Sequence, residues 1–297
     1  MLKALVSGID GFTGRHLSAE FARRGYRTSG LVHKASPHDD AFVHECDLLD
    51  LDGLTRICEI EQPDIVVHLA AVAFVAHNDV SAIYQTNIVG TRNLLNALTS
   101  AGCKPRAVIV ASSANVYGNA DCGVCDESVA PGPANDYAVS KLGVEYVSRL
   151  WMDRLPITIV RPFNYTGVGQ SEKFLLPKIV AHFRNQAPVI ELGNLNVVRD
   201  FSDVRDVVSA YARLAEGNFA GQVFNVCSGI GYSLEEVLAM VTEISGHQLE
   251  VRVNPAFVRG NEVHKLIGDN SRLRNSIGDV SRIALPDTLS WMLGKSA

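Results

Sequence analysis

A tyrosine and a lysine four residues apart form the first group that could do chemistry. Residues 137–141 read YAVSK within a stretch of helical character, so Tyr137 and Lys141 should project from one helix face. A phenol has a pKa of about 10, and a neighbouring ammonium stabilises the phenolate and lowers that pKa. Such a group can exchange a proton with a carbonyl or an alcohol, as hydride transfer requires. A Tyr/Lys pair with this spacing usually lies on a helix surface without a function. Here Ser112 and Ser113 supply an upstream hydroxyl, which makes the pattern specific for a catalytic group.

Three glycines could hold a dinucleotide beside that group. Residues 8–14 read GIDGFTG, after the first apolar run and at the start of a helical stretch. Gly8 would make the tight turn, Gly11 would let the backbone approach a pyrophosphate, and Gly14 would let the helix pack on the strand. The free N–H groups of the helix N-terminus would then face the phosphates. The alternative is a plain glycine turn.

The end of the second strand favours NADP(H) over NAD(H). An NAD site carries an acid about 20 residues after the glycine motif, where it binds the ribose hydroxyls. Here no acid appears before Asp39, whereas His33 and Lys34 would suit a 2′-phosphate. A solvated lysine at a strand end is the alternative, so NAD(H) stays possible. Asp47, after the next strand, could accept from the adenine amino group or cap the following helix.

These residues need a scaffold, and the apolar pattern predicts a doubly wound α/β sheet of Rossmann type. Short apolar runs alternate with helical stretches, as in a parallel sheet buried on both faces. The expected strands are 2–7, 27–32, 64–69, 106–112, 157–160 and 222–226. The expected helices are 13–24, 78–101, 137–153, 172–185, one opened by Asp203, and 287–293.

The regular alternation of apolar runs and helical stretches ends after Arg161, where turn residues cluster over 162–169. Residues 1–161 plus about 201–227 are expected to form the NAD(P)-binding Rossmann domain. Residues of about 162–200 plus 228–297 are expected to form a smaller C-terminal α/β substrate domain.

Composition excludes several classes of protein. The 297 residues are 47% hydrophobic and 20% charged, as in a globular protein rather than a disordered, collagenous or coiled-coil one. A net charge of −5 offers no basic field for nucleic acid or an anionic membrane. No apolar run approaches the roughly 20 residues of a membrane span, and the first glycine turn comes too early for a signal peptide. A cytoplasmic location is therefore the default.

Only two of the six cysteines, Cys122 and Cys125, are close in sequence. A redox or zinc pair is one interpretation, but no second pair and no Cys/His cluster follows. A loop with two free thiols is expected, and no metal site is predicted.

Together these motifs resemble the extended short-chain dehydrogenase/reductases, the family of nucleotide-sugar epimerases, dehydratases and reductases. The resemblance covers nearly the whole chain and also rests on residues 68–71 (HLAA), 86–91 (TNIVGT), 112–118 (SSANVYG) and 161–164 (RPFN). It implies that Ser113 and Tyr137 contact the sugar C4 oxygen, with Tyr137 as acid/base, while Lys141 holds the nicotinamide ribose. His68 should be structural. The residues expected at the cofactor are Gly8, Gly11, Phe12, Thr13, Gly14, His33, Lys34, Asp47, Leu48, Leu69, Ala70, Ala71, Asn87, Tyr137, Lys141 and Pro162.

Within the family, residues 135–142, 192–201 and 225–229 are similar to the branch of GDP-mannose 4,6-dehydratases and GDP-4-keto-6-deoxymannose reductases. The branch implies that Arg199 binds a diphosphate, with Arg259 and Glu262 in a second nucleotide-binding segment; a guanidinium fork suits phosphate oxygens. The alternatives are an Arg199 ion pair with Asp200 or Asp203, and a plain i,i+3 pair between Arg259 and Glu262. The residues expected at the substrate are Ser113, Asn115, Asn164, Arg199, Arg259 and Glu262. Two long helices resemble those of the family's four-helix interface, so a homodimer is expected.

Three reactions share this scaffold. Family dehydratases resemble one another in an acid after the catalytic Ser/Thr, where this chain has Ala114 and Asn115. A C4 epimerase keeps NAD bound, which the missing acid after the second strand argues against. NADPH-dependent reduction of a nucleotide-linked 4-keto-6-deoxy sugar, GDP-linked by resemblance, fits best, and NAD-dependent epimerisation stays the alternative. A silent, non-enzymatic homologue would be expected to lose Ser113, Tyr137 or Lys141, and all three are present.

Overall fold

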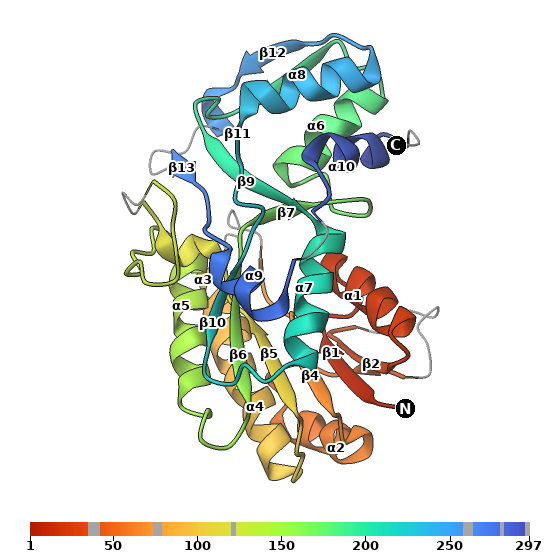
Figure 1. Ribbon diagram of the computed structural model, residues 1–297, viewed down its shortest axis with the longest axis vertical. Coiled ribbons are helices and arrows are strands. Elements are labelled where there is room, and N and C mark those ends of the chain that lie inside the picture. The colour runs from red at the N-terminus through yellow and green to blue at the C-terminus, as the bar shows by residue number, and fades with distance from the viewer. Residues whose placement is uncertain (35–41, 74–78, 120–122, 258–263, 280–281, 295–297) are drawn as a thin grey trace.

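Seven parallel strands form the larger sheet of the computed structural model, which describes residues 1–34, 42–73, 79–119, 123–257, 264–279 and 282–294. Their order is β10-β6-β5-β4-β1-β2-β3 (Figure 1). The bounds are β1 (Lys3–Ser7), β2 (Arg27–Val32), β3 (Val43–Glu45), β4 (Ile65–His68), β5 (Ala107–Ala111), β6 (Ile157–Pro162) and β10 (Val223–Val226). The predicted doubly wound, Rossmann-like sheet is therefore confirmed.

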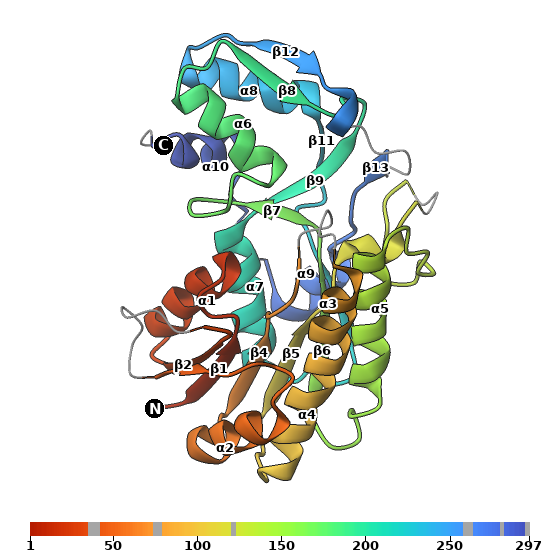
Figure 2. The same ribbon diagram turned by 180° about the vertical axis from the view of Figure 1, so that it is seen from behind.

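Helices cover both faces of this sheet because successive side chains of a strand point to opposite faces. Ala4 and Val6 pack with α1 (Phe12–Arg23) and α7 (Val204–Glu216), while Leu5 packs with α2 (Leu51–Glu61) and α4 (Gly90–Ser100). Figure 2 shows the second face, where α5 (Asp136–Arg149) lies beside α4. Burial on both faces explains why these strands are apolar throughout rather than alternating.

The long helix expected over 78–101 is interrupted. It consists of α3 (Val80–Tyr84), a π-helical turn (Gln85–Val89) and α4. The turn carries Asn87, whose Oδ1 accepts from the Val72 N–H at 2.8 Å and whose Nδ2 donates to Ser140 Oγ at 2.8 Å. Such π-turns are frequent at functional sites, and this one ties the segment after β4 to helix α5.

A smaller part of the molecule lies beyond the carboxyl ends of the main strands, at the top of Figure 1. Its apolar core joins α6 (Leu175–Arg184), α8 (Leu234–Ser245) and α10 (Leu285–Met292) to short strands. These strands are β8 (Val189–Leu192), β9 (Val198–Asp203), β11 (Gly231–Ser233) and β12 (Glu250–Val253). Two further short strands, β7 (Asn164–Thr166) and β13 (Lys265–Leu266), pair with β9. Within the described ranges, no helix combines the length and apolarity that crossing a bilayer demands.

A buried ion pair fastens α5 to the sheet. Arg161 on β6 donates from Nε and Nη2 to the two carboxylate oxygens of Glu145, both at 2.8 Å. Ser112 Oγ donates to the same carboxylate at 2.7 Å. Arg161 Nη1 also donates to Tyr117 Oη, which donates to Asn225 Oδ1. Both charges are thus fully hydrogen-bonded in a place where an unpaired charge would be costly.

Glu145→Gln should lower the free energy of unfolding by about 3 kcal/mol or more, because it leaves the Arg161 charge buried without a counter-ion. Chemical denaturation monitored by circular dichroism measures the change. Glu250→Gln is the matched control, since the Glu250–Arg252 pair is 58% exposed on each side, and it should leave the midpoint unchanged. Equal midpoints for Glu145→Gln and the parent would show that the buried pair contributes nothing.

Candidate active site

The glycine motif forms the turn between β1 and α1. Gly8 has a φ of +72°, which favours glycine. A Cβ on Gly14 would lie 2.2 Å from the Gly8 carbonyl oxygen, so α1 can approach the strand end this closely only with glycine there. The N–H groups opening α1 therefore lie at the carboxyl edge of the sheet, the edge where open α/β sheets bind ligands. This close-packed turn fits a dinucleotide diphosphate.

The segment after β4 runs beside that turn. The Leu69 and Ala70 N–H groups donate to Ser7 Oγ at 3.1 and 3.2 Å, and Ala70 is the nearest neighbour of Gly8. His68 is buried between Ser7 Oγ at 2.6 Å and Thr91 Oγ1 at 2.9 Å. Burial, aided by the charge of Lys141, lowers the pKa of His68 to about 3. The ring is therefore neutral and connects Ser7 to Thr91 by hydrogen bonds, which agrees with its expected structural role. Ala71 follows Ala70 at the same edge of the sheet.

His33 and Lys34 follow β2, and both are exposed. His33 Nδ1 lies 3.8 Å from Asp47 Oδ2. The interpretation of Asp47 as a helix cap is wrong, because Asp50 caps α2 by accepting from the Gly53 N–H at 2.9 Å. Asp47 instead accepts from the Leu49 N–H, and Leu48 beside it is buried. Asp39 lies outside the described residues.

Strand β5 and helix α5 bring Ser113, Tyr137 and Lys141 together. Ser113 follows β5 and is buried, while Asn135 caps α5 by accepting from the Ala138 N–H at 2.9 Å. Lys141 is buried; its Nζ donates to the Ala111 carbonyl at 2.8 Å and lies 6.0 Å from the Tyr137 ring centroid. The predicted one-face arrangement of the phenol and the ammonium is thus present beside the serine.

Burial shifts the pKa values of Tyr137 and Lys141 in opposite directions. Burial raises the pKa of Tyr137 to about 12, and hydrogen bonding with Ser113 opposes that rise. Burial lowers the pKa of Lys141 to about 8. Burial dominates the pKa of Tyr137 in the chain by itself, and Lys141 directs its ammonium at the Ala111 carbonyl. Lowering of the phenol pKa by Lys141 therefore stays a prediction.

The residues expected at the substrate lie in different parts of the structure. Asn115 directs both its backbone N–H and its Nδ2 at Ser113 Oγ, at 3.1 and 3.0 Å. Asn164 opens β7, which pairs with β9 just beyond Pro162, the last residue of β6. Arg199 Nη1 donates to the Val198 and His264 carbonyls at 3.1 and 3.2 Å.

The two acids considered as partners for Arg199 have other contacts. Asp203 pairs with Arg205 at 2.7 Å, and Asp200 accepts from the Ser228 N–H at 2.9 Å. Arg259 and Glu262 lie outside the described residues.

Tyr165 is a contact that sequence reasoning missed. Its hydroxyl lies 2.7 Å from Thr13 Oγ1, and its ring stacks on Phe12 with centroids 6.0 Å apart. Alternation along β7 was the available signal, because the residue after Asn164 must face the opposite side, toward the glycine turn. Tyr165 therefore joins the expected cofactor residues to the smaller part of the molecule.

The cysteine prediction also needs correction. Cys125 is disulfide-bonded, so it is not the free thiol expected, and Cys122 lies outside the described residues. The backbone of Cys125 is fixed by its N–H, which donates to the Ile267 carbonyl at 2.8 Å. Among the residues that the structure describes, no group of His, Cys, Asp and Glu side chains could hold a metal ion.

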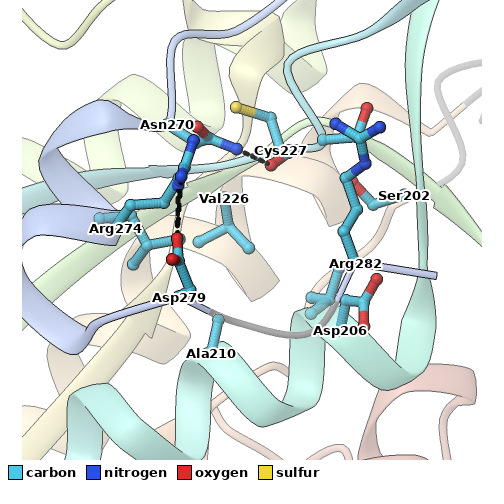
Figure 3. A pocket seen from close by; sticks show the side chains of 12 residues that line it. Ser202, Asp206, Ala210, Val226, Cys227, Asn270, Arg274, Asp279 and Arg282 are labelled. Atoms are coloured by element: carbon cyan, nitrogen blue, oxygen red, sulfur yellow. Dashed lines mark hydrogen bonds and ion pairs between the residues drawn. The ribbon is translucent and has the colours of Figure 1, made fainter. Parts of the chain in front are cut away.

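A cavity of about 280 Å³ lies apart from these residues, between α7, the end of β10 and α9 (Ser271–Ile277) (Figure 3). Val226 and Ala210 form part of an apolar floor, with Arg274 and Arg282 on opposite sides. Arg274 pairs with Asp279 at 2.8 Å. No residue predicted for the cofactor or the substrate lines this cavity.

Comparison with known proteins decides the family. The sequence model of the NAD dependent epimerase/dehydratase family matches residues 4–227. The chain belongs to this family. The predicted family and enzymatic class, an NAD(P)-dependent oxidoreductase, are thereby confirmed.

Two curated relatives match this family member over nearly its full length. The GDP-6-deoxy-D-talose 4-dehydrogenase of Aggregatibacter actinomycetemcomitans is 36% identical over 280 residues, which are 94% of this chain and 92% of the relative. The GDP-6-deoxy-D-mannose reductase of Pseudomonas aeruginosa is 34% identical over 302 residues, which are 98% of this chain and 96% of the relative.

Two solved structures share the fold. A Burkholderia cenocepacia protein, named as a candidate epimerase, is 51% identical with a TM-score of 0.93; the match covers 99% of this chain and 97% of that one. RMD from Pseudomonas aeruginosa, complexed with NADPH, is 32% identical with a TM-score of 0.86; the match covers 99% of this chain and 98% of that one.

Tyr137→Phe keeps the ring and removes the hydroxyl that is expected to exchange the proton. Cofactor binding should survive, while turnover should fall roughly 100-fold or more, the scale of general acid–base catalysis. Turnover is followed by nicotinamide absorbance and binding by nicotinamide fluorescence. A variant within a few-fold of the parent would remove Tyr137 from the catalytic role.

Proposed function

We propose that this enzyme uses NADPH to reduce the C4 ketone of a nucleotide-linked 4-keto-6-deoxy sugar, with GDP as the nucleotide. One observation carries the proposal. Ser113, Tyr137 and Lys141 meet at the carboxyl edge of the sheet, while the two positions after Ser113 offer no acid: Ala114 is buried and apolar, and the Asn115 amide is bonded to Ser113. This set serves proton transfer to one oxygen and lacks the further acid/base that loss of water demands.

The relatives support the substrate class. Two are named for a dehydrogenase and a reductase acting on GDP-6-deoxy sugars, and RMD from Pseudomonas aeruginosa was solved with NADPH. Epimerisation at C4 is the second candidate, because it needs the same tyrosine and because the Burkholderia cenocepacia protein is named as a candidate epimerase. The basic pair His33 and Lys34 after β2 favours NADPH, and hence reduction.

Each residue of the site would have a separate role in the reaction. Bound NADPH supplies a hydride to C4. Tyr137 gives its proton to the C4 oxygen, so that the ketone gains two hydrogens and becomes an alcohol. Ser113 donates a hydrogen bond to the same oxygen, and Lys141 would hold the nicotinamide ribose and offset the negative charge of the phenolate.

We propose the following division of the chain. The larger sheet with residues 1–161 and about 201–227 binds the cofactor. The smaller part, about 162–200 and 228–297, binds the nucleotide sugar through Asn164, Arg199, Arg259 and Glu262.

We also propose a homodimer through α4 and α5. Val139 and Tyr146 on α5, Leu150 directly after α5 and Val89 directly before α4 are exposed apolar side chains. Covering these four side chains with a second copy would remove apolar surface from water, which stabilises an interface.

Cofactor stoichiometry separates reduction from the other two reactions. With GDP-4-keto-6-deoxymannose, the purified protein should oxidise one NADPH per sugar and yield a GDP-6-deoxyhexose, and with GDP-mannose it should do nothing. An epimerase or dehydratase regenerates its cofactor and shows no net consumption. Conversion of GDP-mannose to the keto sugar without net use of cofactor would refute the proposal and require a proton-transferring carboxylate elsewhere.

Lys34→Glu tests the cofactor preference. The reversed charge should weaken NADPH binding more than NADH binding, because only NADPH carries the 2′-phosphate. Dissociation constants come from fluorescence titration with both cofactors. Lys104→Glu is the matched control: it is exposed just before β5, at the opposite edge of the sheet, and should change neither constant. Equal or better binding of NADH by the parent would reverse the assignment.

A further inference from the structure

We propose that Asn115 is a positioning residue that fixes the direction of the Ser113 O–H, so that Ser113 acts only as a hydrogen-bond donor and Tyr137 delivers its proton directly. The proposal deepens the proposed function and rests on it. It adds a positioning role to the substrate contact expected of Asn115.

The geometry at Ser113 Oγ carries the argument. The backbone N–H of Asn115 lies 3.1 Å from this oxygen, and Nδ2 of the same residue lies 3.0 Å from it. Both nitrogens are donors, and a hydroxyl has two acceptor positions and one proton. Asn115 therefore fills both acceptor positions of Ser113 and leaves the serine only its proton to offer.

The local backbone makes this arrangement rigid. Ser113 caps the 3₁₀ turn Ala114–Tyr117, and the contact with the Asn115 N–H is that cap. The Asn115 side chain adds a second donor to an oxygen already held by the backbone. Ser113 is buried, so water cannot readily replace either donor.

The remaining proton of Ser113 would then be shared between the C4 oxygen and the Tyr137 oxygen, the two neighbouring acceptors between which the Tyr137 proton moves. In keeping with this, hydrogen bonding with Ser113 lowers the pKa of the Tyr137 phenol, against the larger effect of burial. Ser113 thus stabilises the phenolate that remains after proton transfer.

The same geometry excludes a relay through the serine. A relay would require Ser113 to accept the Tyr137 proton, but Asn115 occupies both acceptor positions. The Tyr137 O–H bond therefore breaks as the bond from hydrogen to the C4 oxygen forms, while the hydride from NADPH reduces C4. The phenolate then accepts the Ser113 hydrogen bond.

Asn115→Asp tests the inference because it is nearly isosteric but replaces a donor by an acceptor. The carboxylate should draw the Ser113 proton to itself and away from the reacting oxygen. We expect kcat to fall about 100-fold, the scale for losing one preorganised donor, with KM little changed. The high-pH limb of kcat should move to higher pH, because the phenolate loses a donor and gains a negative neighbour.

A double-mutant cycle separates positioning from substrate binding. In the Ser113→Ala background, Asn115→Asp should cost less than about 3-fold in kcat, because the hydroxyl that it redirects is gone. Thermal midpoints and NADPH dissociation constants of all four proteins check that each folds and binds cofactor. Equal losses in both backgrounds, or a raised KM with kcat unchanged, would overturn the inference.

The cycle remains informative if the proposed function fails. Epimerisation at C4 also uses Ser113 and Tyr137, so the same four proteins can be compared on that reaction. An active epimerase that shows the coupling would refute the reductase proposal alone, and an active reductase without the coupling would refute this inference alone.

Discussion

The buried pair between Glu145 and Arg161 is the interaction on which the site depends. Lys141 and Glu145 lie four residues apart on α5, so the ion pair and the lysine expected at the cofactor share one helix face. Glu145 also accepts from Ser112, the residue before Ser113, and Arg161 immediately precedes Pro162. Two buried charges carry a large desolvation cost, which is tolerated only in the bidentate, fully bonded geometry observed. That requirement leaves α5, β5 and β6 little freedom to shift relative to one another.

A second constraint joins the cofactor turn to the smaller part of the molecule. Tyr165 reaches from β7 to Thr13, and two neighbouring contacts follow: His16 Nε2 lies 3.0 Å from the Val168 carbonyl, and Arg15 Nη2 lies 3.4 Å from the Gly169 carbonyl. The residues that open α1 therefore contact the segment that continues from the strand carrying Asn164. The expected cofactor and substrate residues thus share one network of contacts. Asn164 and Tyr165 are adjacent on one strand, so their side chains point to opposite faces of it.

The sequence was sufficient to predict the scaffold, because the patterns that indicate its strands and helices are local. Strand β2 occupies the predicted residues 27–32, and α7 begins after Asp203 as predicted, because apolar runs and caps act within a few residues. The predictions that failed concern features that depend on contacts between residues distant in sequence. The helix over 78–101 contains a π-turn where Asn87 bonds to Val72 and Ser140, and no periodicity shows that. The pKa of Tyr137 is raised because burial, which depends on the whole fold, is its largest cause.

The two shifted pKa values together describe the protonation state of the chain by itself. With a pKa of about 12, Tyr137 keeps its proton at neutral pH, and with a pKa of about 8, Lys141 still carries its charge there. The chain by itself therefore holds a phenol ready to give a proton beside an ammonium that would stabilise the phenolate left behind. Burial disfavours the phenolate in the chain by itself. Burial and the hydrogen bond with Ser113 thus act on the Tyr137 pKa in opposite senses. In the proposed reduction, burial would keep the proton on the phenol beforehand, and the hydrogen bond would stabilise the charge that remains once the proton has left.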